Sequence, residues 1–129
     1  MDESYNANPL SMMSAIKNLN NYKKDLNKIL IIGDMLELGV HSKKHHKLIS
    51  NIINNTDINK VYVYGNLVKE TFKNLKNNKK GKILKNKEDI KKIFIENIKN
   101  KDLVMIKGSN ASGLFKITQS LKKGKINVL

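Results

Sequence analysis

The sequence lacks three residue types entirely, and each absence narrows the class of protein. Without cysteine, neither a disulfide framework nor a cysteine-based zinc site can form. Tryptophan and arginine are also absent. No wholly apolar run exceeds four residues, whereas a spanning helix needs about 20. Met1 is followed directly by Asp2, without the basic and apolar regions of a secretory signal. The sequence therefore predicts a soluble, cytoplasmic protein that does not enter a membrane.

The net charge is +14, and lysine supplies every strongly basic side chain. Such a charge is typical of proteins that bind anionic partners, with nucleic acid the first candidate. Arginine, however, is the better group for bidentate contacts with bases and phosphates, and it is missing. Lysine, asparagine and isoleucine are all abundant, and all have AT-rich codons. We interpret the charge as compositional drift and expect no specific nucleic-acid partner; a functional basic surface is the alternative.

Apolar runs alternate with helical patterns along the chain. Strands are predicted over residues 28–34, 60–65, 82–85 and 102–108, and helices from Asn8-Pro9 onward and over residues 42–54, 66–75, 88–99 and 112–122. Asparagine is a favoured N-cap, and proline suits a first helical turn. Repeated strand–helix–strand units imply a mainly parallel sheet. We therefore predict an α/β, Rossmann-like domain of three layers, with helices on both faces of the sheet.

The whole chain, residues 1–129, is predicted to be one domain. Only seven residues precede Asn8, which predicts that a strand ahead of this helix has been truncated. The helix over residues 42–54 is expected to turn four apolar side chains inward, namely Leu48, Ile49, Ile52 and Ile53. The lysine- and asparagine-rich stretch 73–87 is predicted to be a solvated loop around a short edge strand.

Polar and glycine-containing segments are predicted to gather at one edge of the sheet. In open parallel sheets, ligands bind outside the carboxyl ends of the strands. Four segments are expected there, namely residues 2–8, 33–39, 65–66 and 107–113. This clustering predicts a binding site at that edge, which we call the carboxyl rim.

The segment KGSNASG most resembles an anion-binding turn. Gly108 and Gly113 have the GxxxxG spacing of a P-loop, but Leu114-Phe115 follow where Walker A needs Lys-Ser or Lys-Thr. The turn could still present helix N-terminal N–H groups to a carboxylate or phosphate. The side chains available for such an anion are Lys107, Ser109, Asn110 and Ser112. The alternative is a plain strand-to-helix turn with Ser112 as N-cap.

Two carboxylates and three histidines lie near the second strand-to-helix junction. Asp34 and Glu37 could bind a metal or orient a ribose, or could lie in a solvated loop. His41 and His45 have the i, i+4 spacing that zinc could use, but no glutamate completes an HExxH pattern. We predict no metal site, and we expect His45 or His46 to be a partly buried helix residue.

Taken together, three segments are far more specific than any one of them. DESYNANP, IGDMLELG followed by HSKKHH, and IKGSNASGLF occur in this order over almost the whole chain. The sequence thereby resembles the C-terminal domain of the Mur ligases. The YNANP form together with GDMLELG indicates the member that adds D-alanyl-D-alanine to UDP-MurNAc-tripeptide in peptidoglycan synthesis.

The resemblance implies an ATP-dependent, peptide-bond-forming ligase of three domains. An N-terminal domain would hold the UDP-sugar, and a central domain would carry a P-loop and Mg²⁺ ligands. ATP would phosphorylate the terminal carboxylate of the peptide, and the dipeptide amine would attack the acyl phosphate. Residues 1–129 contain no Walker A sequence. We therefore expect the isolated chain to be inactive and to bind neither ATP nor Mg²⁺ tightly.

The resemblance also implies roles for individual residues. The residues placed at the ATP ribose and nucleotide are Asp2, Glu3, Tyr5, Asn6 and Asn8. Those placed at the carboxylate of the added dipeptide are Lys107, Ser109, Asn110 and Ser112. Asn110 stands where many members have arginine, so this chain would need Lys107 or backbone donors instead. Asp34, Glu37 and His46 match a family signature, either as ligand contacts or as supports of the rim.

Two other functions remain open from the sequence. One is a freestanding basic α/β module that binds nucleotides or nucleic acid; lysine without arginine gives this only weak support. The other is a related amide ligase, such as the folate-glutamylating enzymes, which the YNANP and GDMLELG segments disfavour.

Overall fold

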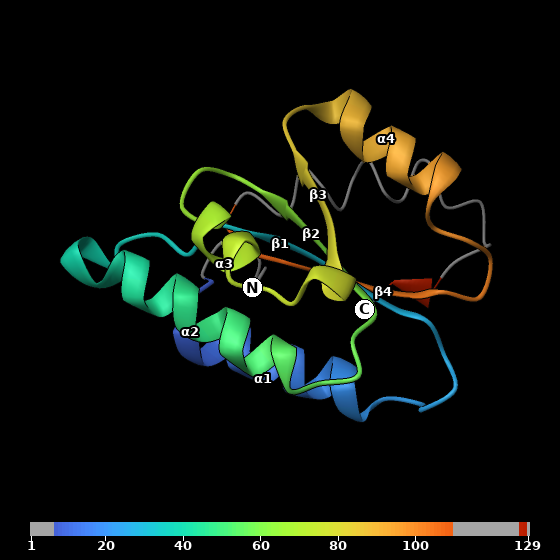
Figure 1. Cartoon of the computed structure of the whole chain (residues 1–129), viewed down its shortest axis with the longest axis horizontal. Coiled ribbons are helices and arrows are strands. Elements are labelled where there is room, and N and C mark those ends of the chain that lie inside the picture. Colours follow the sequence, from blue (N-terminus) through green and yellow to red (C-terminus); the bar gives the residue numbers. More distant parts are fainter. Residues whose placement is uncertain (1–6, 110–126, 129) are drawn as a thin grey trace.

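The computed structural model of the chain describes residues 7–109 and 127–128 (Figure 1). The α-helices are α1 Pro9–Asn21, α2 Ser42–Asn54, α3 Lys69–Lys73 and α4 Lys87–Glu96. Two 3-10 helices are η2 Gly39–His41 and η3 Asn77–Lys79. The strands are β1 Lys28–Gly33, β2 Lys60–Tyr64, β3 Lys80–Leu84, β4 Leu103–Lys107 and β5 Asn127–Val128. Among these residues, no helix is both long and apolar enough to cross a bilayer.

The strands form one parallel sheet in the order β3-β2-β1-β4-β5. The predicted α/β fold with a parallel sheet is thus confirmed, and β3 lies at an edge as expected. The short β5, which pairs with β4, was not predicted from the sequence. The predicted helix over residues 112–122 lies outside the described residues.

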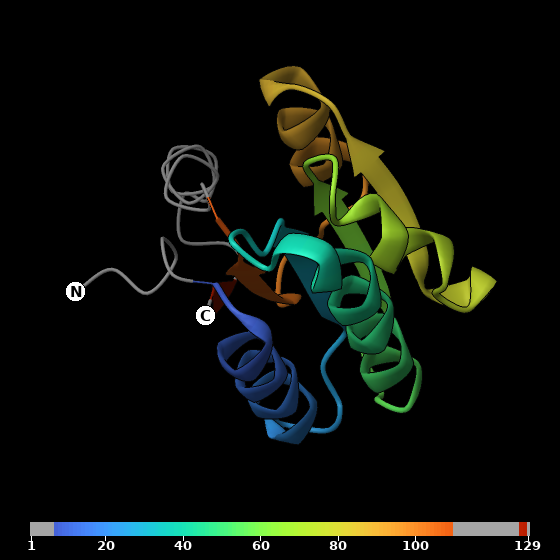
Figure 2. The ribbon, with the colours of Figure 1, turned by 90° about the vertical axis from the view of Figure 1, so that its left-hand side faces the viewer.

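Alternate side chains of the central strand pack on opposite faces of the sheet. Leu30 and Ile32 lie in the apolar cluster formed with α1 and α2. Ile29 and Ile31 lie in a second cluster, formed with α4. The molecule thus has three layers: Figure 2 shows α1 and α2 together on one side of the sheet and α4 on the other. A strand buried on both faces explains the uninterrupted apolar run in its sequence.

The beginning of α1 follows the prediction closely. The Asn8 side chain accepts the Ser11 N–H at 2.9 Å, and the Ser11 hydroxyl accepts the Asn8 N–H at 3.0 Å. This reciprocal capping box satisfies two backbone donors that the helix itself leaves without partners. Pro9 occupies the first turn, where its missing N–H costs nothing.

Three helix predictions need correction. The helix predicted over residues 88–99 ends at Glu96. Leu48 is 43% exposed, because the inward stripe of α2 has i, i+3, i+4, i+7 spacing and consists of His46, Ile49, Ser50 and Ile53. The helix predicted from residue 66 begins only at Lys69. Residues 66–68 form a turn in which the Val68 N–H donates to the Asp34 carboxylate at 2.8 Å.

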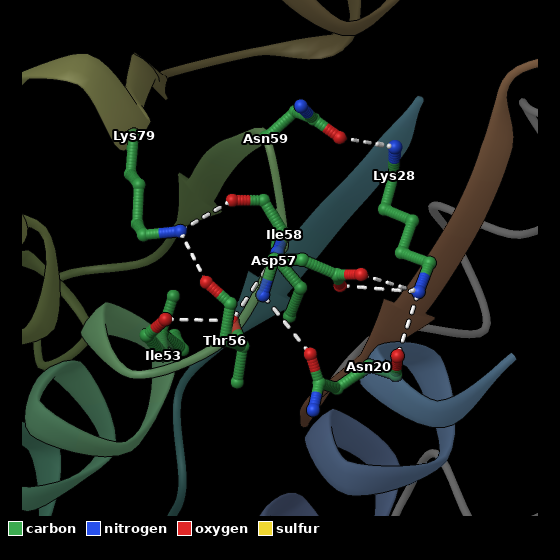
Figure 3. Close-up of polar contacts among 8 residues, drawn as sticks. All are labelled: Asn20, Lys28, Ile53, Thr56, Asp57, Ile58, Asn59 and Lys79. Carbon is green, nitrogen blue, oxygen red and sulfur yellow. Dashed lines mark hydrogen bonds and ion pairs between the residues drawn. The ribbon is translucent and has the colours of Figure 1, made fainter. Parts of the chain in front are cut away.

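The lysine-rich stretch 73–87 is not simply a solvated loop. Lys79 is buried, and its Nζ donates to the carbonyls of Thr56 and Ile58 at 2.8 and 2.7 Å (Figure 3). Burial lowers the pKa of Lys79, and the nearby Lys76 lowers it further. Two carbonyl partners thus hold this lysine at the amino ends of the strands. We call this end of the sheet the amino edge; it lies opposite the carboxyl rim.

A second lysine at this amino edge, Lys28, is completely buried. Its Nζ donates to the carbonyl of Asn20 at 2.7 Å and to both carboxylate oxygens of Asp57 at 3.1 Å (Figure 3). These contacts join the end of α1, the start of β1 and the loop before β2. Lys28 and Lys79 are therefore buried structural residues at the amino ends of the strands.

Candidate functional site at the carboxyl rim

Glycines bring the ends of three strands close together at the carboxyl rim. Gly33 ends β1, while Gly65 and Gly108 follow β2 and β4. A Cβ atom on Gly108 would lie 2.4 Å from the backbone nitrogen of Gly33. Real Cβ contacts are never this short, so the backbones after β1 and β4 touch only because no side chain separates them.

Asp34 joins the turns that follow all three strands. Its carboxylate accepts the Val68 N–H at 2.8 Å, and its carbonyl accepts the Ser109 N–H at 2.9 Å. A Cβ on Gly65 would lie 2.5 Å from the Asp34 carboxylate. Asp34 therefore connects the turns after β1, β2 and β4.

The structure brings Lys107 and Ser109 to the end of β4, as predicted. Lys107 pairs with Ile32 of β1, at the carboxyl end of both strands, and both Lys107 and Ser109 are buried. The Ser109 amide is already engaged by Asp34, so it cannot also serve an anion. Anion donors must therefore come from side chains or from neighbouring residues. Asn110 and Ser112 lie outside the described residues.

The other signature residues occupy contrasting positions. Glu37 is exposed on the loop after β1 and has a φ of 63°, a left-handed conformation that glycine adopts more easily. His46 is buried, and its Nε2 accepts the Met35 N–H at 3.1 Å. Because it is exposed, Glu37 is accessible to a ligand, whereas the buried His46 holds the backbone of the same loop through the Met35 N–H.

The predicted nucleotide-side residues are represented in the described part of the chain by Asn8. Its side chain caps α1, so the oxygen is used by the Ser11 N–H. The remaining members of that set, Asp2, Glu3, Tyr5 and Asn6, lie outside the described residues.

The histidines do not form a metal site of three ligands. His46 uses both ring nitrogens on backbone groups. The rings of His41 and His45 meet edge to face, with centroids 6.4 Å apart. Within residues 7–109, no group of three or more His, Cys, Asp or Glu side chains is arranged to hold a metal ion.

Sequence reasoning missed how the rim is held together. The signal was available in the glycines that close three strands, Gly33, Gly65 and Gly108. Thr71, on α3, gave no such signal, yet its hydroxyl donates to the His46 carbonyl at a distance of 2.6 Å. Contacts between segments that are distant in sequence decide these roles.

The fold and the rim define an open, parallel α/β domain. Its strand ends carry the loop with Asp34 and Glu37 and the turn Lys107-Gly108-Ser109, which we call the KGS turn. Residues 3–110 match the family model described as Mur ligase, glutamate ligase domain. The chain belongs to this family, which confirms the resemblance seen in its motifs.

Individual relatives agree with this placement. The chain is similar to the UDP-N-acetylmuramoyl-tripeptide–D-alanyl-D-alanine ligases of Buchnera aphidicola subsp. Acyrthosiphon pisum and subsp. Baizongia pistaciae. Each is 45% identical over 56 residues, which is 43% of this chain and 12% of the relative. A crystal structure of MurF ligase from Thermotoga maritima, in complex with ADP, aligns with a TM-score of 0.74 and 26% identity. The alignment covers 95% of this chain and 27% of that one, so this chain spans about a quarter of its length.

Proposed function

We propose that this chain is the domain of an ATP-dependent ligase that receives D-alanyl-D-alanine during peptidoglycan synthesis in the cytoplasm. The family match and the names of the relatives support the ligase class and this particular member. The observation that carries the proposal is the seating of the KGS turn: Asp34 holds Ser109 beside Lys107 at the carboxyl rim.

In this proposal the rim binds the dipeptide through its carboxylate. The ammonium of Lys107 and the hydroxyl of Ser109 supply charge and a hydrogen-bond donor, in place of an arginine at Asn110. Holding the carboxylate leaves the dipeptide amine free to attack the acyl phosphate of the UDP-MurNAc-tripeptide. The new amide bond forms as the phosphate leaves, and the amine loses a proton. Orientation of this kind accelerates bimolecular reactions substantially.

The nucleotide enters the proposal through the relatives. The Thermotoga maritima enzyme was solved with ADP. For this chain we propose ATP as the phosphoryl donor, with Mg²⁺ supplied with the nucleotide. The described residues include no ready-made group of three metal ligands, so no step of the proposal is assigned to a metal held by them.

Replacing Lys107 with methionine should raise the KM for D-alanyl-D-alanine at least about tenfold and leave the KM for ATP nearly unchanged. A charge-assisted hydrogen bond is worth about 1.5–3 kcal/mol, and tenfold corresponds to about 1.4 kcal/mol. The assay is steady-state ligation by a Thermotoga maritima MurF ligase in which this chain replaces the matching segment.

Lys28→Met is the matched control for this experiment. Lys28 is also a buried lysine, but it lies at the amino end of β1, whereas Lys107 lies at the carboxyl end of the neighbouring β4. The control should lower stability without altering the dipeptide KM. Equal effects of Lys107→Met on both substrates, or on neither, would contradict the carboxylate assignment.

A further inference from the structure

The buried His46 has hydrogen-bond partners at both ring nitrogens. Its Nε2 lies 3.1 Å from the backbone nitrogen of Met35. Its Nδ1 lies 2.8 Å from the carbonyl oxygen of Ser42 and 3.3 Å from the hydroxyl oxygen of the same residue, which can accept as well as donate. An amide N–H can only donate, so Nε2 must present a lone pair. A carbonyl oxygen can only accept, so Nδ1 must carry the proton. Both neighbours therefore specify the neutral ring with its proton on Nδ1.

The Met35 N–H belongs to the same peptide group as the Asp34 carbonyl, which accepts the Ser109 N–H at 2.9 Å. A peptide group is planar, and its N–H and C=O point in opposite directions. The planar Asp34–Met35 peptide is thus hydrogen-bonded at both ends, its N–H to His46 and its carbonyl to Ser109. Rotation of this peptide plane away from His46 would turn the carbonyl away from Ser109.

The His46 side of this arrangement is itself firmly anchored. His46 is 1% exposed, and its carbonyl accepts the Thr71 hydroxyl at 2.6 Å. Water cannot easily replace a lost bond at such a position, so a buried N–H without an acceptor is unfavourable. His46, on α2, therefore determines the orientation of the Asp34–Met35 peptide plane.

We propose that His46, in its neutral Nδ1–H form, is the positioning residue of the KGS turn. It orients the Asp34–Met35 peptide so that the carbonyl seats Ser109 next to Lys107. These two hydrogen bonds, of the Met35 N–H to His46 and of the Ser109 N–H to the Asp34 carbonyl, require no substrate. Its consequence for dipeptide binding rests on the function proposed above.

The test compares His46→Gln with His46→Leu in the ¹⁵N-labelled chain. The glutamine side-chain oxygen can accept the Met35 N–H in place of Nε2, whereas leucine offers no acceptor. In His46→Leu, amide hydrogen exchange at Met35 and Ser109 should accelerate at least about tenfold relative to the amide of Ile31 in the central strand. His46→Gln should restore most of the protection.

Thr71→Val provides the matched control, since it removes the hydrogen bond that anchors the His46 backbone but leaves both ring nitrogens with their partners. Exchange at Met35 and Ser109 should accelerate less in this variant than in His46→Leu, and an equal acceleration would contradict the role of the ring. Imidazole ¹⁵N shifts of the wild-type chain give an independent reading, with Nε2 in the range of an unprotonated nitrogen.

A protonated Nε2, unchanged relative exchange at Ser109 in His46→Leu, or glutamine no better than leucine would each overturn the positioning role. None of these readouts uses a ligand. They therefore pass or fail separately from the dipeptide proposal, which the KM of Lys107→Met decides.

Discussion

Replacing Gly108 with alanine should lower the free energy of unfolding by about 2–6 kcal/mol. The new Cβ would lie 2.4 Å from the Gly33 nitrogen, and this neighbour is backbone, which cannot rotate aside. Gly108 also has a φ of 138°, a conformation that costs other residues about 1–3 kcal/mol. Displacing packed atoms adds about 1–3 kcal/mol more. Urea denaturation followed by circular dichroism measures the change.

Gly39→Ala is the matched control, because Gly39 also has a positive φ, 57°, but nothing lies within 4 Å of its added Cβ. It should cost about 1 kcal/mol, the penalty of the left-handed backbone alone. If the two variants lost equal stability, the close approach of the strand ends at the rim would be refuted.

Asp57→Asn should lower the free energy of unfolding by about 3 kcal/mol, although Asp57 is itself half exposed. The change leaves the completely buried ammonium of Lys28 without its counter-charge. Lys28→Met removes the buried charge altogether and leaves a carboxylate that water can reach. It should therefore cost less than Asp57→Asn, about 1 kcal/mol. The measurement is again urea denaturation of the three proteins.

The exposed pair Lys91–Glu88, at 3.8 Å, provides the reference for a surface interaction. Lys91→Met should change stability by less than about 0.5 kcal/mol. A loss in Asp57→Asn no greater than that in Lys91→Met would show that the Lys28 ammonium is not held as described.

Local sequence patterns were sufficient to predict a parallel sheet, its first four strands, the start of α1 and the bounds of α2. The uninterrupted apolar residues of β1 indicate burial on both faces, and Asn8-Pro9 marks the start of α1. The motifs DESYNANP, GDMLELG and KGS were sufficient to place the chain in its family. Such signals lie within short segments and survive without knowledge of tertiary contacts.

What could not be predicted depends on contacts between distant segments. A buried histidine on α2 was expected, but its partner was not: the His46 ring accepts the Met35 N–H, eleven positions earlier, whereas Leu48 is exposed. Residues 66–68 form a turn because Asp34, more than thirty positions earlier, accepts the Val68 N–H. The burial of Lys28 depends likewise on Asp57, which periodicity cannot reveal.

The most direct test of the dipeptide site is an NMR titration of the ¹⁵N-labelled chain with D-alanyl-D-alanine. The ligand should produce saturable shifts at the amides of Gly108 and Ser109, and none at Asp57 on the opposite edge of the sheet. The same dipeptide with its carboxyl group amidated should produce no such shifts, because the proposed contact is with the carboxylate. Identical shifts with both ligands, or none at the rim with either, would contradict the account.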